Sequence, residues 1–316
     1  MAKTLRLLII INLVFFSGES IHAESFNKAG IATAHPLATK AGYEILEVGG
    51  NAFDAAVTVS AVLSVVEPYS SGLGGGGFFL LHNAEDGQSV FVDAREKAPS
   101  MADRDMYLDD NGDVLRTASL NGPLASGIPG LPAALYHVTN NHGSMPLYKL
   151  LEPAIRLARD GFPAYERLIT ALNVAKKSRT LSPKFKAVFM PNDQLPEVGQ
   201  LIKQPELAKT LEIIASNGHD GFYSSFFTQK MIDEARQDGS IWLADDFKNY
   251  SVVEREPIEL NFLGTQLTTA PPPSSGGTTI ATILNIISEF DFIQMDISTR
   301  THLVVESMRR AYRDRA

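Results

Sequence analysis

The chain has 316 residues and a formal net charge of −8, with 36 acidic and 28 basic side chains. An acidic surface disfavours nucleic acids and anionic membranes as partners, because both are themselves negatively charged. The chain contains no cysteine, which excludes disulfides, thiol chemistry and cysteine-ligated metals.

The first residues have the pattern of a secretory signal peptide. Lys3 and Arg6 form a basic start, an apolar run follows, and Ala23 suits a cleavage site. The alternative is a membrane anchor, but the run is shorter than the roughly 20 apolar residues that a span needs. We therefore predict a signal peptide over residues 1–23, a mature region over residues 24–316 without a membrane anchor, and a periplasmic or secreted location.

Two helices are predicted at the start of the mature region. Pro36 can begin a helix that the glycine pair at 49–50 ends. Asn51 can cap a second helix, with Asp54 in its favourable first turn. The run 55–66 contains β-branched residues that favour a strand, but its length and its cap favour a buried helix.

The stretch 71 SGLGGGGFFL 80 fits the G-x-G-x-x-G spacing of a dinucleotide-binding loop from Gly72 to Gly77. Such a loop follows a strand and starts a helix, whereas here the predicted helix comes first and strand-like residues follow. Two strand-like runs around Asp86-Gly87 predict a β-hairpin instead. Two interpretations remain: the glycines allow a close backbone approach, or they form a tight corner without a ligand.

The region 129–238 contains five segments with helical patterns, four of which end at or near a glycine. Two extended runs around Leu263-Gly264 follow, then a helix over 278–290 and a last helix that Ser298 can cap. Strands at both ends of the mature region, including a short one near Ile31, enclose these helices. This order predicts a layered α/β or α+β domain.

Few side chains indicate chemistry directly. The histidines show no H-E-x-x-H motif, no close pair on one helix face and no acidic neighbours at ligand spacing, so we expect no metal site. No G-x-S-x-G elbow is present either. Arg95, in 93 DAREKAP 99, lies at the end of a predicted strand, and its planar fork suits a bidentate carboxylate. A salt bridge to Asp93 or Glu96 is the alternative role for this arginine.

Several stretches together resemble the large-subunit region of the γ-glutamyltransferases, also called γ-glutamyltranspeptidases or glutathione hydrolases. The similarity extends from about Gly30 to Ala316. It is carried, in this order, by HPLATKAGYEILEVGGNAFDAAVTVSAVLSVVEPYSSGLGGGGFFL, DAREKAP, GIPG, PPPSSGG and ESMRRAYRDRA.

The resemblance implies an N-terminal nucleophile hydrolase, made as a proenzyme that cuts itself into large and small subunits of one αββα sandwich. A threonine at the new N-terminus of the small subunit then attacks the γ-glutamyl amide of glutathione. The acyl group passes to water, or to an amino acid or peptide. By the same resemblance Arg95 corresponds to the arginine that binds the α-carboxylate of the substrate, and no cofactor is expected.

The sequence departs from this family in one respect. The family nucleophile lies in a T-T-H-x-S-type stretch, whereas the similar pairs here, at 268–269, 278–279 and 301–302, lack that context and match the large subunit. The last helix also has no glycine or proline stop after it. We therefore expect a large subunit alone, or a truncated reading frame, that contains no catalytic residue and is inactive by itself.

Three hypotheses follow. The first is an exported γ-glutamyltransferase whose partner is the small subunit of the same precursor, with this catalytic half either supplied by another chain or missing from this sequence. The second is a stand-alone binding protein that uses Arg95 and the glycine loop to hold γ-glutamyl or amino-acid ligands. The third is a truncation product that does not fold, because half of a sandwich leaves a sheet edge and an apolar face bare.

Overall fold

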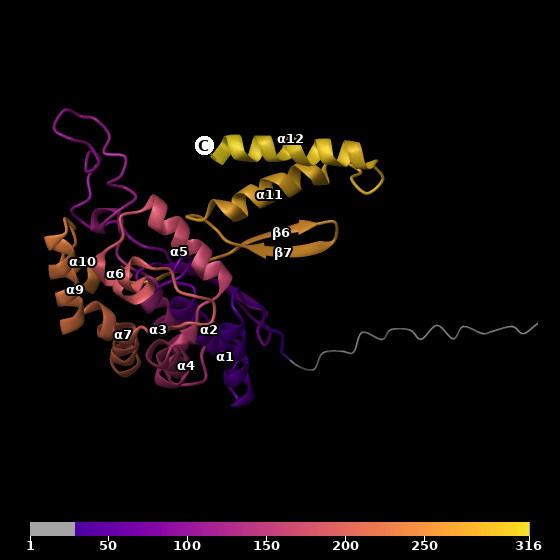
Figure 1. Cartoon of the computed structure of the whole chain (residues 1–316). Helices are drawn as coiled ribbons and strands as arrows, with labels where there is room; N and C mark the ends of the chain where they lie inside the picture. Colours follow the sequence, from indigo (N-terminus) through magenta and orange to yellow (C-terminus); the bar gives the residue numbers. More distant parts are fainter. Residues whose placement is uncertain (1–28, 316) are drawn as a thin grey trace, which may run out of the picture. The chain divides into compact units, whose positions relative to one another are not determined.

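The computed structural model describes residues 29–315, which are drawn in colour in Figure 1. The predicted signal peptide, residues 1–23, lies outside the described residues. Everything described from Ala32 onward belongs to one structural unit. In this described part of the chain, no helix has the length and apolar character that crossing a membrane requires.

The first two helices confirm the predictions made from their capping residues. Helix α1 spans Pro36–Glu47, and helix α2 spans Ala52–Val66. Asn51 and Asp54 form a reciprocal capping box, in which each side chain accepts a hydrogen bond from the backbone N–H of the other, at 2.8 and 2.9 Å. The cap and the burial of the helix outweigh the β-branched residues, so the run 55–66 is helical.

A three-stranded antiparallel sheet has the order β1-β2-β5. Strands β1 (Gly77–Asn83) and β2 (Gln88–Ala94) form the predicted hairpin. Strand β5 (Val253–Arg255) joins the edge of β2 from far along the chain, and the sequence patterns did not predict it.

The two faces of this sheet differ in their surroundings. Phe79, Leu81 and Val92 point to the face that packs into the helical core, where α3 contacts β2. Helix α3 spans Leu131–His142. On the opposite face, Phe78 and Leu80 remain 38% and 44% exposed. This second face is only partly covered, because Phe91, which lies opposite Leu80, is 1% exposed.

The five predicted helical segments are confirmed. Besides α3, they are α4 (Leu147–Asp160), α5 (Glu166–Ser178), α7 (Pro205–Asn217) and α9 (Phe226–Gln237). The core forms where α2 packs against α1, α3 and α4, and where α4 packs against α7.

Shorter elements between these helices were not predicted. They are α6 (Pro183–Phe189), α8 (His219–Tyr223), α10 (Ala244–Lys248), the 3₁₀ turns Pro123–Ala125 and Pro191–Asp193, and the two-residue strands β3 (Phe162–Pro163) and β4 (Leu201–Ile202), which pair with each other.

The last described elements are a hairpin and two helices. Strands β6 (Ile258–Phe262) and β7 (Thr265–Thr269) pair around the predicted Leu263-Gly264 turn, and α11 (Ser275–Ser288) packs against α12 (Ile297–Arg315).

Three local predictions in this fold were wrong. Helix α11 begins at Ser275 instead of residue 278, because the side chain of Ser274 caps it. Asp296, not Ser298, caps α12: its Oδ1 accepts hydrogen bonds from the backbone N–H groups of Ser298 and Thr299. The expected strand near Ile31 is absent, since residues 29–33 have no regular structure.

Candidate functional site

Arg95 immediately follows the last residue of β2, as the sequence predicted for this candidate binding residue. Its side chain is exposed, and within residues 29–315 its guanidinium forms neither an ion pair nor a hydrogen bond. The alternative prediction, a salt bridge from Arg95 to Asp93 or Glu96, is therefore not found.

Asp93 is instead engaged by an arginine from another strand. Its Oδ2 atom lies 2.9 Å from Nε and 2.8 Å from Nη2 of Arg255, on β5. This two-pronged contact uses the carboxylate that Arg95 could otherwise reach. Its other oxygen, Oδ1, accepts a hydrogen bond of 3.1 Å from the backbone N–H of Arg95.

The backbone of Arg95 is also held from its carbonyl side. The hydroxyl of Tyr250 donates to this carbonyl oxygen at 2.8 Å, and the Tyr250 ring stacks on Tyr223 with centroids 5.4 Å apart. Burial, with smaller contributions from Asp93 and Glu96, raises the pKa of Tyr250, which keeps the hydroxyl protonated as a donor. The main chain of Arg95 is thus fixed on both sides while its charged end stays free.

The glycine loop, residues 72–77, lies against this segment. A methyl group on Gly76 would overlap the carbonyl oxygen of Ala94 and would lie 2.9 Å from the backbone nitrogen of Glu96. The carbonyl of Gly75 accepts hydrogen bonds from the first amides of the α3 region, those of Gly130 and Leu131, at 2.9 and 3.0 Å. The loop therefore provides the predicted close backbone approach, and what it approaches is the chain itself.

The GIPG stretch, residues 127–130, completes the same cluster. Lys97 and Ile128 exchange two backbone hydrogen bonds, of 3.2 and 2.7 Å. A side chain on Gly130 would overlap the carbonyl of Ala94 and the hydroxyl of Tyr250. Three motifs that are separate in the sequence thus form one backbone platform, from which the Arg95 side chain projects. This platform can present a fixed cationic fork to a carboxylate.

The threonine pairs that resemble a nucleophile motif have structural roles. The hydroxyls of Thr278 and Thr279 donate to the carbonyl of Ser275, and that of Thr301 donates to the carbonyl of Ile297. These are local side-chain to backbone hydrogen bonds within α11 and α12. The stretch 271–277 contains the turn and the serine cap that begin α11.

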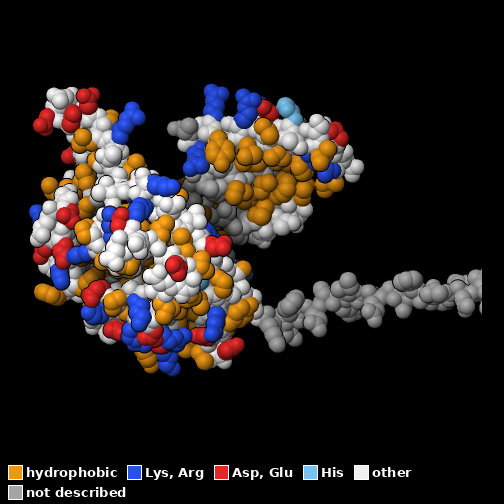
Figure 2. Space-filling view, in the orientation of Figure 1, with side chains coloured by type: hydrophobic (Ala, Val, Ile, Leu, Met, Phe, Trp, Pro, Cys, Tyr) orange, Lys and Arg blue, Asp and Glu red, His pale blue; other side chains and the backbone are white. Residues whose placement is uncertain are grey.

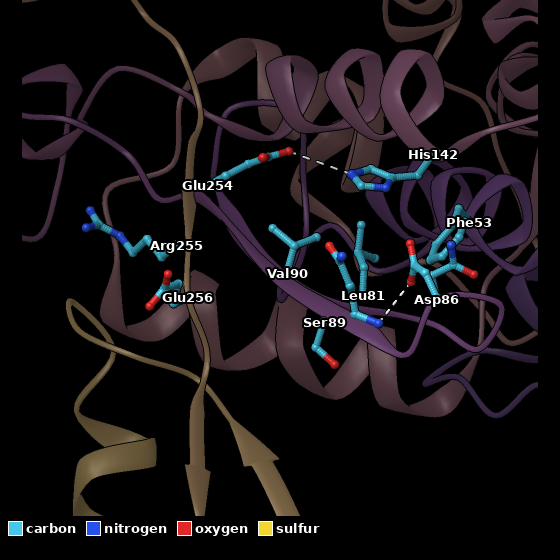
Figure 3. Close-up of a pocket in the computed structure, with 11 residues that line it drawn as sticks. Phe53, Leu81, Asp86, Ser89, Val90, His142, Glu254, Arg255 and Glu256 are labelled. Atoms are coloured by element: carbon cyan, nitrogen blue, oxygen red, sulfur yellow. Dashed lines mark hydrogen bonds and ion pairs between the residues drawn. The ribbon is translucent and has the colours of Figure 1, made fainter.

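A second group of polar residues was not foreseen from the sequence. His137 and His142 of α3 lie close to Glu254 of β5, and their ligand atoms are all within 4.8 Å of one another. His142 and Glu254 also line a cavity of about 400 Å³ (Figure 3). The sequence predicted no metal site because the acidic residue is far away along the chain. Strand β5 brings it beside the two histidines, so only the sheet pairing shows the group.

Comparison with known proteins gives consistent matches over nearly the whole chain. The family model described as Gamma-glutamyltranspeptidase matches residues 38–316. The chain is similar to the glutathione hydrolase proenzyme of Bacillus subtilis (strain 168), with 37% identity over 291 residues, covering 90% of this chain and 49% of the relative. For the glutathione hydrolase proenzyme of Escherichia coli (strain K12) the identity is 38% over 289 residues, covering 90% and 50%.

The chain thus spans about half the length of the curated relatives it matches. Among solved structures it resembles Helicobacter pylori gamma-glutamyltranspeptidase with a TM-score of 0.87 and 36% identity, covering 91% of this chain and 83% of that one. These likenesses confirm the predicted layered α/β fold of the N-terminal nucleophile hydrolases, of which the described residues provide the large-subunit region.

Proposed function

The chain belongs to the γ-glutamyltranspeptidase family, and on that premise we propose that it is the large-subunit half of a glutathione hydrolase. In this proposal the chain binds the γ-glutamyl substrate, while a threonine nucleophile outside this sequence performs the acyl transfer. Glutathione and other γ-glutamyl compounds are the donors, and water, amino acids or peptides are the acceptors.

The observation that carries this proposal is the free guanidinium of Arg95 on a fixed backbone platform. An unpaired, exposed arginine fork can form two parallel hydrogen bonds to a carboxylate. The α-carboxylate of a γ-glutamyl group is such a ligand, and it lies at the far end of that group from the scissile amide. Arg95 therefore positions the substrate and takes no part in bond breaking.

The remaining chemistry is assigned to a small-subunit threonine. Its α-amine takes the hydroxyl proton while the oxygen attacks the γ-carbonyl carbon. Fixed donors stabilise the resulting oxyanion, each worth roughly 3 kcal/mol in comparable acyl transfers. The amine leaves with a proton, and water or an acceptor amine then takes the acyl group from the threonine oxygen.

Exposed apolar surfaces support the presence of a small-subunit partner. Figure 2 shows hydrophobic side chains gathered on the helical region near the C-terminus. The exposed ones include Ile297, Val305 and Tyr312 of α12, and Phe290 and Ile293 between α11 and α12. Phe78 and Leu80 are also exposed, on the partly covered sheet face. Large exposed apolar areas are typical of interaction surfaces. A second sheet laid on this face is what an αββα sandwich requires.

We also propose that the protein is made as a self-cleaving zymogen with a signal peptide over residues 1–23, and that it acts in the periplasm or outside the cell. The basic and apolar pattern of these residues supports export. The two matched relatives named proenzymes support processing.

The test is release of p-nitroaniline from γ-glutamyl-p-nitroanilide by the purified chain, with and without a co-expressed small subunit from a relative. Activity only with the small subunit is the expected result. Activity from the chain alone would contradict the assignment of the nucleophile to a region outside this sequence.

A second candidate function, non-catalytic binding of γ-glutamyl or amino-acid ligands, is favoured by the fact that the Arg95 platform is complete within this chain. Calorimetric titration of the chain alone with glutathione distinguishes the two. Binding that Arg95→Ala abolishes, together with no activity in any reconstitution, would favour the binding protein. A chain that does not fold without its partner would support the truncation hypothesis.

A further inference from the structure

His137, His142 and Glu254 form the one group within residues 29–315 in which three metal-ligating side chains converge. We propose that they bind a divalent transition-metal ion, with Zn²⁺ as the best match. Two imidazoles and one carboxylate are a ligand set that zinc favours, with a fourth position left for water. The proposal does not rest on the γ-glutamyl function, because these residues lie outside the Arg95 platform.

The spacing of the three ligand atoms suits a small cation. Oε1 of Glu254 lies 2.8 Å from Nε2 of His137 and 3.7 Å from Nε2 of His142, and all three ligand atoms lie within 4.8 Å of one another. Tetrahedral zinc with bonds of about 2.0–2.2 Å separates its ligand atoms by about 3.3 Å. Side-chain shifts of about an ångström therefore suffice to place an ion between them.

The buried Nε2 atom of His142 lacks a partner, which supports a ligand at this position. This atom is shielded from solvent, yet it has no hydrogen-bond partner. The 3.7 Å to Glu254 is an ion-pair separation and too long for a hydrogen bond. A shielded ring nitrogen without a partner is costly, and a metal ion at this point would satisfy it.

The neighbouring residues hold the ligands in place. The ring of Phe53 packs against His142 with centroids 5.5 Å apart, and the amide nitrogen of Asn141 lies 3.1 Å from both ring nitrogens of His137. Glu254 lies opposite Val92 in the sheet register, which directs it to the face that α3 covers. In Figure 3 the Glu254 carboxylate and the His142 ring point toward each other.

The surrounding charge also favours a cation. Two neutral imidazoles and one carboxylate give the group one negative charge. Arg255, which also lines the cavity, points away from Glu254 in Figure 3 and is paired with Asp93. His142 and Glu254 line the 400 Å³ cavity, so the fourth coordination position opens toward it and is accessible to water.

Metal binding would replace the hydrogen bond between His137 and Glu254. In the metal-free protein, the proton between Nε2 of His137 and Oε1 of Glu254 makes the 2.8 Å hydrogen bond. When the ion takes that position, the neutral ring carries its proton on Nδ1 instead, and the side-chain amide of Asn141 turns its oxygen to accept it. The ion then links α3 to β5, the last strand of the three-stranded sheet, and we expect it to stabilise the fold.

The experiment uses the full chain purified without a polyhistidine tag and dialysed against a chelator. Zn²⁺ is titrated by calorimetry, and Co²⁺ by its visible absorption, which reports tetrahedral nitrogen and oxygen ligands. We expect one ion per chain, and a melting temperature that rises when Zn²⁺ is added. The proposal would be overturned if calorimetry and absorption spectra showed no binding at millimolar concentrations of the metal ion.

Variants localise the ion. His137→Ala, His142→Ala and the isosteric Glu254→Gln should each weaken Zn²⁺ binding by about 100-fold or more, since even loss of a supporting residue costs about 10- to 100-fold. His82→Ala is the matched control, because His82 is an exposed histidine of β1 whose ring is hydrogen-bonded to Ser89. Equal losses in His82→Ala, or unchanged affinity in all three ligand variants, would refute the site. The melting temperature of each metal-free variant shows whether weaker binding comes from misfolding or from loss of a ligand. We expect Glu254→Gln to fold.

Discussion

Asp93 pairs with Arg255 of a distant strand and not with Arg95, its neighbour two residues along the chain, although both arginines are available. The carboxylate receives Nε and Nη2 of Arg255 at 2.9 and 2.8 Å. Arg95 therefore keeps its guanidinium unpaired, because Arg255 of β5 pairs with Asp93 instead. This arrangement makes the role of Arg95 testable without loss of the fold.

Arg95→Lys should raise KM for γ-glutamyl-p-nitroanilide in the reconstituted enzyme by about 10- to 100-fold, because a hydrogen bond to a charged group contributes about 1.5–3 kcal/mol. Lysine keeps the charge but loses the planar fork. Arg95→Ala should do the same, with melting temperatures unchanged, since this exposed side chain has no ion pair or hydrogen bond to lose among the described residues. The exposed Arg104, paired only with adjacent Asp105, provides the Arg104→Ala control. An unchanged KM would remove Arg95 from the site, and unfolding of Arg95→Ala would show a structural role.

Gly76→Ala should destabilise the protein by about 1–3 kcal/mol, the usual cost of inserting a methyl group where none fits. The new methyl would overlap the carbonyl of Ala94 and crowd the backbone of Glu96, so the loop or the end of β2 must move. Gly74→Ala is the control in the same loop, because its methyl group would meet nothing within 4 Å. Chemical denaturation of both variants gives the two free energies of unfolding. Equal stability would mean that the close approach at Gly76 does not constrain the loop.

Asp54→Asn should lower the free energy of unfolding by about 2 kcal/mol or more, because a buried donor left without its acceptor costs about 1–3 kcal/mol. The carboxylate is fully buried and accepts from the backbone of Asn51 at 2.9 Å, from Ser144 Oγ at 2.6 Å and from the Ser144 and Met145 amides. The amide NH₂ of asparagine would face these donors. Ser144→Ala removes one of the contacts and should cost less. An unchanged free energy of unfolding in Asp54→Asn would mean that the neighbouring amides find other acceptors.

The pKa of His35 makes stability depend on pH. Burial lowers this pKa below its ordinary value of 6.5, with Glu67 opposing the shift, and the neutral ring caps α1 by accepting from the amide of Leu37. The folded state therefore binds fewer protons than the unfolded state below about pH 6.5. The stability that this group contributes is present above that pH and is lost as the pH falls through the lowered, folded-state pKa.

His35→Asn keeps a capping oxygen but cannot titrate. We expect urea denaturation to show a larger fall in unfolding free energy from pH 7.5 to pH 5 for the wild-type protein than for His35→Asn. All other ionisable groups are common to both proteins, so the difference isolates His35. Identical pH dependence in the two proteins would show that the ring is not held neutral.

The amino-acid sequence by itself determined what depends on neighbours along the chain. Capping at Asn51, glycine ends and hydrophobic periodicity fixed the long helices, and the turn at Asp86-Gly87 fixed the first hairpin. It also placed Arg95 at the end of a strand. These features follow from hydrogen bonds and sterics over a few residues, so the pattern suffices to predict them.

Only the tertiary structure decided which distant groups meet. Strand β5 has three residues and no pattern of its own, yet its pairing with β2 supplies Arg255 to Asp93 and Glu254 to the histidines of α3. The contact between Gly76 and the end of β2 likewise depends on how the hairpin folds back on the loop. The β5 pairings join residues more than a hundred positions apart, and it is this packing that leaves Arg95 unpaired and gathers a metal-ligand set.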